Sequence, residues 1–410
     1  MLSAYAVNTT VKQDYRATSA IVPMDNTAPR PTLDERFANL LICPLRVAAM
    51  LGKRSPGEVT FAESEQSYAR RRLLHVEKIA IENKRLESLN EASFLDYISH
   101  ELHALILQDI ADQAQHPHIL FSNTLNFSDE VPVMLDILST KAASVSRLEP
   151  SVASMPWLYE ELMQLVNSQR FRRKDARGRV IPVENLRTAL SFIGIGNLRL
   201  LLPSLLLKRA MPQITDPFPQ IKVTLSQYAT ATGLSARALA CHYQADPFAA
   251  YLTGMLANLG RCCITRLYFK TFEYMHRHQL EQAQQLRQRD VHEALQKITP
   301  SANYLIALQD EFADKLTADL LADMPFKRLP AQAIISAVTP APRAGSVSYS
   351  QLLNAARCYA RVKMLHQAKA ADKSEIKQLI RQQAFVPGAL ETLKRVDIFT
   401  LPFAIETDIQ

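Results

Sequence analysis

The sequence predicts an all-α protein. Only 10 of its 410 residues are glycine and 7% are aromatic, whereas leucine, alanine, glutamine and arginine, which favour helices over strands, are abundant. Hydrophobic residues make up 48% and charged residues 21% of the chain, as in a globular protein. Apolar residues recur at helical spacing over long stretches, with no hairpin signal between them. A chain of this length is expected to form more than one structural unit.

The first 125 residues divide by composition into an arm and a helical module. Residues 1–31 are polar and contain three prolines without helical periodicity, so we expect a mobile arm. Residues 32–125 are expected to form a separate or appended helical module. Its first helix, from Leu33 to Met50, should be broken by Pro44, because proline lacks the amide proton that a helix interior needs.

The segment from Ala62 to Ala114 is almost free of glycine and proline. Its apolar spacing predicts two long helices that break near Asn90. Amphipathic helices of this kind need a second apolar surface to cover their stripe. That surface is either a partner protein or the rest of this chain, and the sequence leaves both possibilities open.

A central buried helix is predicted from Pro247 onward. Asp246 can accept hydrogen bonds from the first backbone amides, and Pro247 suits the first helical position. The apolar positions form one stripe at helical period, namely Phe248, Tyr251, Leu252, Met255, Leu256 and Leu259. Gly254 and Gly260 weaken a helix, so we expect them to mark a close backbone approach or the helix end.

The segment from Thr253 to Gly260 resembles the "GLLHDIG" motif of the HD superfamily of metal-dependent phosphohydrolases. Ala257 and Asn258 stand where those enzymes carry the metal-binding His-Asp pair. That loss is typical of HDOD domains, which are regulatory relatives of the HD hydrolases. The chain resembles this family over residues 130–370, so the fold implied is an HDOD/HD-like helical domain with the additional helical N-terminal region.

Two further segments resemble the family's helix connections. Leu165 to Ser168 is similar to the "aNSa" signature that closes a helix in HDOD domains. Pro182 to Leu201 is similar to the family's connection between two helices. Within it we expect Gly194 to end the first helix and Asn197 to cap the second.

Other positions that hold metal-binding histidines in HD relatives also lack them here. The segment Tyr228 to Ala231 matches the region of an expected histidine and contains none. Ala337, Val338 and Thr339 stand where many relatives carry a later histidine pair. The resemblance therefore implies no catalytic residue, no bound metal and no cofactor.

The function implied is a non-catalytic regulatory role in bacterial signal transduction, exerted through contacts with protein partners. An HD-type phosphohydrolase with a divergent site stays open as an alternative. Replacement ligands such as His242 or Asp246 would require a different site geometry.

A second alternative is a nucleotide or nucleic-acid binder. The net charge is +7 and the sequence pI is near 9.1, and much of the local excess lies in one segment predicted to be a loop. Its basic residues are Arg172, Arg173, Lys174, Arg177 and Arg179. They form either a solvated loop between helices or a contact for an anion or an acidic partner.

The remaining features concern location and the end of the chain. The longest apolar segment, Leu198 to Leu207, is too short and too interrupted to span a membrane, and no secretory leader is recognised. Five scattered cysteines suit reduced thiols, so a cytoplasmic location is expected. Residues 371–410 are expected to form a C-terminal helical tail.

Overall fold

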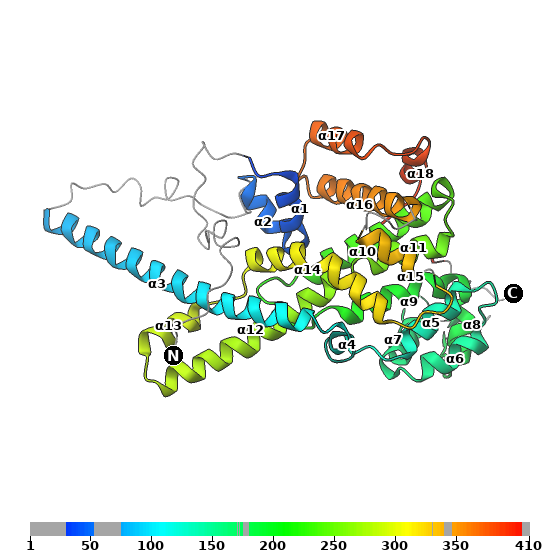
Figure 1. Ribbon diagram of the computed structural model, residues 1–410, viewed down its shortest axis with the longest axis horizontal. Coiled ribbons are helices and arrows are strands. Elements are labelled where there is room, and N and C mark those ends of the chain that lie inside the picture. Colours follow the sequence, from blue (N-terminus) through cyan, green and yellow to red (C-terminus); the bar gives the residue numbers. More distant parts are fainter. Residues whose placement is uncertain are drawn as a thin grey trace.

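The structure is a computed structural model that describes residues 30–52, 75–169, 171, 173–174, 180–329, 331–339 and 347–403. Within these ranges helices provide nearly all the regular structure, which confirms the all-α prediction (Figure 1). Of the predicted N-terminal arm, residues 1–29 lie outside the described ranges.

Three helices precede the HDOD-like part of the chain: α1 (Leu33–Ile42), α2 (Pro44–Met50) and α3 (His75–Ala114). The Thr32 hydroxyl accepts from the Glu35 amide at 3.2 Å, and the Glu35 carboxylate accepts from the Thr32 amide at 2.8 Å. This reciprocal cap fixes the start of α1. Pro44 opens α2, so the predicted break at this proline is confirmed.

The predicted break near Asn90 is wrong. Helix α3 runs without interruption through Asn90 to Ala114. An asparagine inside a helix costs only about 0.7 kcal/mol relative to alanine, which the packing of the rest of the helix offsets. Figure 1 shows the first turns of α3 extending away from the other helices, whereas its last turns lie beside α12.

A short turn of helix leads from α3 into a group of five helices. The elements are α4 (Pro117–Ile119), a π-helical segment (Leu120–Thr124), α5 (Glu130–Ser139), α6 (Val145–Ala153), α7 (Pro156–Asn167), α8 (Leu186–Ile193) and α9 (Ile195–Ala210). The buried carboxylate of Asp136 on α5 accepts from the backbone amides of Lys327, Arg328 and Leu329 at 2.6, 3.1 and 2.8 Å. These charge-assisted bonds tie α5 to a loop almost two hundred residues later.

The link between α7 and α8 and the corner between α8 and α9 each depend on an asparagine. The Asn167 amide donates to the Val183 carbonyl at 3.0 Å and its oxygen accepts from the Val183 amide at 2.8 Å, as a strand neighbour would. Gly194, at φ 77°, ends α8 as predicted. Asn197 does not cap α9, because α9 already begins at Ile195; its side chain donates back to the Ile193 carbonyl at 2.8 Å.

The centre of the molecule contains α10 (Ile221–Leu239), a 3₁₀ turn (Ala240–Tyr243), α11 (Pro247–Leu256) and α12 (Leu259–Gln285). Asp246 caps α11, accepting from the Phe248 and Ala249 amides at 3.0 and 2.9 Å, as predicted. The predicted continuous stripe is divided, since α11 ends at Leu256 and Leu259 opens α12. The turn between these helices redirects the chain.

The two glycines of this region allow close helix contacts. A Cβ on Gly254 would lie 2.6 Å from the Thr232 carbonyl oxygen, so α11 can approach α10 only with glycine there. A Cβ on Gly260 would lie 2.6 Å from the Thr317 hydroxyl oxygen. Of the two roles predicted for these glycines, close approach or helix end, the structure shows close approach at both positions.

Six helices complete the described chain: α13 (Arg289–Lys297), α14 (Ala302–Asp323), α15 (Ala331–Val338), α16 (Val347–Gln367), α17 (Lys373–Gln383) and α18 (Ala389–Lys394). Helix α16 packs on α10, α11 and α15, and α17 packs on α16. One large cluster of buried apolar side chains includes residues of α1, α3 and every longer helix from α5 to α14, and continues into α16 and α18. The division of the chain into 1–31, 32–125, 130–370 and 371–410 stays a prediction.

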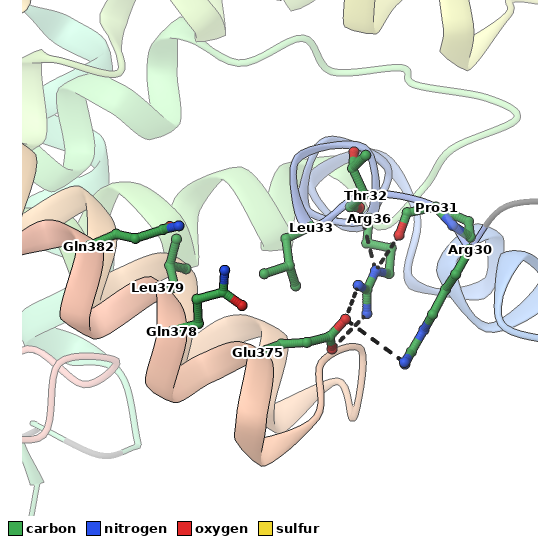
Figure 2. A pocket seen from close by; sticks show the side chains of 9 residues that line it. All are labelled: Arg30, Pro31, Thr32, Leu33, Arg36, Glu375, Gln378, Leu379 and Gln382. Carbon is green, nitrogen blue, oxygen red and sulfur yellow. Dashed lines mark hydrogen bonds and ion pairs between the residues drawn. The ribbon is translucent and has the colours of Figure 1, made fainter.

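Helix α1 contacts the C-terminal part of the described chain through a buried arginine. Arg36 of α1 is 2% exposed and its guanidinium donates to both Glu375 oxygens, at 3.1 and 2.5 Å, and to the Ala370 carbonyl at 2.7 Å. Figure 2 shows Arg36 and Glu375 among the residues that line a hollow between α1 and α17. The volume of this hollow is about 290 Å³. Arg30 pairs with Asp372 at 2.8 Å on the same rim. The ion pairs therefore join α1 to the C-terminal helices.

No single helix within the described ranges is long and apolar enough to cross a membrane. Helices α8 and α9 reach the necessary length and composition only when taken together, and they meet at 106°.

Candidate functional site

The candidate site is the turn between α11 and α12, where Ala257 and Asn258 stand, by the resemblance in sequence, at the positions of the His-Asp pair of HD hydrolases. Both residues are buried, each with 3% of its surface exposed. The cap at Asp246 fixes the start of α11, and Gly254 seats it on α10. At the other side of the turn Gly260 seats α12 on α14, its amide donating to Thr317 at 2.9 Å. These contacts determine the position of the turn.

Residues far apart in the sequence surround Ala257. A small buried apolar cluster joins it to Ala337 and Val338 at the end of α15 and to Leu353 of α16, with Tyr349 packed against the cluster. Two of the sequence segments expected to have lost histidines, 80 residues apart, therefore meet in space. The side chains that meet there are the apolar groups of Ala257, Ala337, Val338 and Leu353.

Asn258 uses its side chain locally. Its amide donates to the Gly254 carbonyl at 3.0 Å, closing the last turn of α11. This bond satisfies a helix-end carbonyl, one of the groups that has no partner within the helix. An amide oxygen is also a weaker metal ligand than a carboxylate, because it carries no net charge.

An arginine adds a positive charge to this junction. Arg357 of α16 donates to the Ala257 carbonyl at 3.1 Å and forms two parallel bonds to the Asp314 carboxylate of α14, at 3.0 and 2.7 Å. Burial lowers the pKa of the Arg357 guanidinium, but the bonds to Asp314 and the nearby Tyr228 hydroxyl outweigh it, so that pKa is raised. The arginine stays charged, with Asp314 as its counterion.

Tyr228 marks the third segment that was expected to lack its histidine. It lies on α10, close enough to Arg357 to act on it electrostatically, and the ring of Phe37 from α1 packs edge-on against it at 5.1 Å. All three altered segments of the HD pattern thus adjoin one junction of α10, α11, α15 and α16. Helix α1, from outside the family resemblance, covers one side of it.

The donor chemistry does not fit the metal that HD enzymes bind. Among the described residues no three His, Cys, Asp or Glu side chains come together in a way that could hold an ion. Asp314 is engaged by Arg357, and Asp246 caps α11. The His242 imidazole is 2.9 Å from the Thr392 hydroxyl. The possible replacement ligands His242 and Asp246 thus each have a hydrogen-bond partner outside the Ala257 cluster.

Sequence reasoning missed Arg357, Asp314 and Leu353. Nothing in the sequence distinguishes Arg357 from other helical arginines, since its role depends on how α16 crosses α11 and α14. Tyr349, Leu353 and Arg357 follow one another at four-residue spacing, which places them on one face of α16. This spacing is the sequence signal that could have grouped the three residues, but it does not show which helix their face contacts.

The basic segment 172–179 is only partly within the described ranges. Arg173 and Lys174 form the two-residue strand β1, which pairs antiparallel with β2 (Val180–Ile181), so the predicted loop carries a short ladder at its base. Arg172, Arg177 and Arg179 lie outside the described residues. Phe171 is buried and its ring is 6.3 Å from that of Phe403. Anion or partner binding by these five basic residues stays a prediction.

Residues 127–304 match the family model of the HDOD domain. This part of the chain is an HDOD domain. The HDOD domain is related to the HD domain, and it fits a regulatory or signalling role. The matched segment includes Tyr228, Ala257 and Asn258, whereas Ala337, Leu353 and Arg357 lie beyond its end.

Among solved structures, the crystal structure of the MmoQ response regulator from Methylococcus capsulatus strain Bath is similar at 19% identity. The similarity covers 62% of this chain and 96% of that one, with a TM-score of 0.24. At that TM-score it supports no conclusion about fold or function. No curated protein matches the sequence.

Proposed function

We propose that this chain is a non-catalytic regulatory protein of a bacterial cytoplasm, whose HDOD domain transmits a signal through contacts with other proteins. The observation that carries the proposal is the set of side chains at the former metal position. Ala257, Ala337 and Val338 offer no donor atom, and Asn258 donates its amide to the Gly254 carbonyl. HD-type hydrolysis needs imidazole and carboxylate ligands that converge on an ion.

The charge at this position supports the same conclusion. A divalent cation beside Ala257 would lie close to the Arg357 guanidinium, which carries a permanent positive charge. A phosphate ester would meet an attractive charge, and the carboxylate beside it, Asp314, is already engaged by two guanidinium nitrogens of Arg357. Binding without hydrolysis is the chemistry that these side chains allow.

Metal analysis of purified protein tests the proposal. Protein purified without added metal should contain far less than one equivalent of Mn, Fe, Ni or Zn. It should also leave bis-p-nitrophenyl phosphate intact in the presence of added Mn²⁺, while an active HD phosphohydrolase purified in parallel cleaves it. Stoichiometric metal together with phosphodiesterase activity that a chelator abolishes would contradict the proposal.

A further inference from the structure

Helix α3 has apolar side chains in two directions, and within the described ranges only one set is covered by other parts of the chain. Leu102, Ile106 and Ile110 are at most 2% exposed and face the body of the molecule, where α3 packs on α12 and α13. Phe94, Tyr97 and Leu105 are 39%, 60% and 41% exposed. At 100° per residue the centre of the exposed set lies roughly 130° around the helix from the centre of the buried set. The other described helices therefore cover one face, and no described residue buries the other.

Phe94, Tyr97 and Leu105 lie on one straight stripe of the helix, together with polar residues. Its members follow one another at spacings of three or four residues, namely Phe94, Tyr97, Glu101, Leu105, Gln108 and Asp112. Six such positions extend for roughly 27 Å along the helix axis. A second helix of about 18 residues would cover that length by placing its own side chains between them.

The charge of this surface differs in sign from that of the whole protein. From Leu89 to Ala114 the sequence contains five acidic residues and no lysine or arginine, although the chain carries a net charge of +7. Glu91, Asp96, Glu101 and Asp112 are exposed, and none of these four forms an ion pair within the described structure. Asp109, the fifth, accepts from Gln113 and Thr271.

We infer that this face of α3 docks a cationic amphipathic helix of a partner protein. Phe94, Tyr97 and Leu105 would receive the partner's apolar side chains, and the carboxylates of Glu101 and Asp112 on the same stripe would pair with its lysines and arginines. Nucleic acids and anionic membranes are repelled by the same carboxylates, so charge selects the class of partner. The inference rests on the proposed function, in that it assigns the protein contact to a surface outside the HDOD domain.

Site-specific photocrosslinking in the native cell tests the inference with the full chain. Benzoylphenylalanine at Tyr97 should crosslink to a lysine- and arginine-rich amphipathic segment of another protein. The matched control is the same substitution at Tyr274 of α12, which is 66% exposed on a different face. Crosslinks from Tyr97 to a second copy of this chain, to a segment without basic residues, or at a yield no higher than from Tyr274 would overturn the inference.

Charge reversal separates docking from incidental contact. With the crosslinker at Tyr97, Glu101→Lys together with Asp112→Lys should lower the yield about tenfold, because two attractive pairs become repulsive. Glu281→Lys with Glu273→Lys on α12 should leave the yield unchanged. As a second measure, Phe94→Ser together with Leu105→Ser leaves every charge in place. This double variant should also lower the crosslinking yield about tenfold. Circular dichroism should show that each variant stays folded. If none of the α3 substitutions lowers the crosslinking yield, the inference is overturned.

The outcome is independent of the metal and phosphodiesterase assays. If docking at α3 fails while the protein still lacks metal and activity, the absence of catalysis stands and only the assigned surface is lost.

Discussion

The Arg357 guanidinium donates a hydrogen bond of 3.1 Å to the Ala257 carbonyl, across 100 residues of sequence. The bond fixes α16 to the end of α11, beside the two residues that the sequence resemblance aligns with the metal-binding pair of HD enzymes. Together with the bidentate pair to Asp314, it joins three helices through one side chain. A directional charged group therefore links helices at a position that, by resemblance, a metal would occupy in the hydrolases.

Restoring a single histidine should not restore a metal site. Ala257→His places an imidazole in a cluster already filled by Ala337 and Val338, so we expect a loss of about 1–3 kcal/mol in the free energy of unfolding. Ala104→His, at an exposed position of α3, should change that free energy by less than about 0.5 kcal/mol. Urea denaturation measures both changes. A rise in the melting temperature of Ala257→His on adding Zn²⁺ or Mn²⁺, absent in Ala104→His, would disprove the prediction.

A methyl group at Gly260 should separate α12 from α14. Its Cβ would lie 2.6 Å from the Thr317 hydroxyl oxygen and closer still to the Ala313 carbonyl, which is backbone and cannot move away easily. We expect Gly260→Ala to lower the free energy of unfolding by about 1–3 kcal/mol. Gly196→Ala is the control, because a Cβ on Gly196 meets nothing within 4 Å and alanine favours the helix by about 0.5–1 kcal/mol. Equal stability of the two variants in thermal denaturation would contradict the close approach.

The contact between α1 and α17 should weaken in acid. Hydrogen bonding from Arg36 lowers the pKa of Glu375 to about 2, below its ordinary value of 4.5. The contribution of the ion pair is therefore complete above about pH 4.5 and disappears as the pH falls through about 2. Glu375→Gln should cost on the order of 2 kcal/mol at pH 7, since Arg36 loses its counterion while Glu375 is itself partly exposed.

Urea denaturation of the native protein and Glu375→Gln at pH 7 and pH 2.5 measures this effect. The stability difference between them should shrink at the lower pH. Glu149→Gln, which removes the partner of the largely exposed Arg187, is the control and should change stability little at either pH. A difference that stays constant with pH would mean that the ionised carboxylate does not contribute.

A second pH effect should come from His103 of α3. The imidazole is 1% exposed, stacks on Tyr304 at 4.1 Å, and has its Nδ1 2.7 Å from the Ser99 carbonyl. Burial lowers the pKa of His103 to about 4. Because the unfolded chain binds the proton near pH 6.5, stability is complete above that value and falls as the pH decreases towards 4.

His103→Phe should reduce the decrease in stability between pH 7 and pH 4.5, because phenylalanine binds no proton. His116→Phe, at an exposed position beyond α3, should leave it unchanged. Chemical denaturation at the two pH values gives the comparison. A decrease of the same size in His103→Phe would show that other groups cause it.

The sequence by itself determined the features that depend on neighbouring residues. The Asp246 cap, the break at Pro44 and the helix end at Gly194 each follow from the backbone chemistry of one or two residues, and the structure contains all three. The glycines at 254 and 260 indicated close packing for a similar reason. The motif around Ala257 also located the candidate site, because the HD resemblance is carried by a short continuous segment.

Only the tertiary structure decided what local propensity does not encode. Asn90 lies inside a continuous helix because its local cost is small beside the burial of the rest of α3, and Asn197 bonds backward because α9 starts earlier than its side chain suggested. The meeting of Ala257 with Ala337, and the part played by Arg357, depend on how α11, α15 and α16 cross. Helical periodicity specifies which face of a helix is apolar, but the partner of that face is set by packing over the whole molecule.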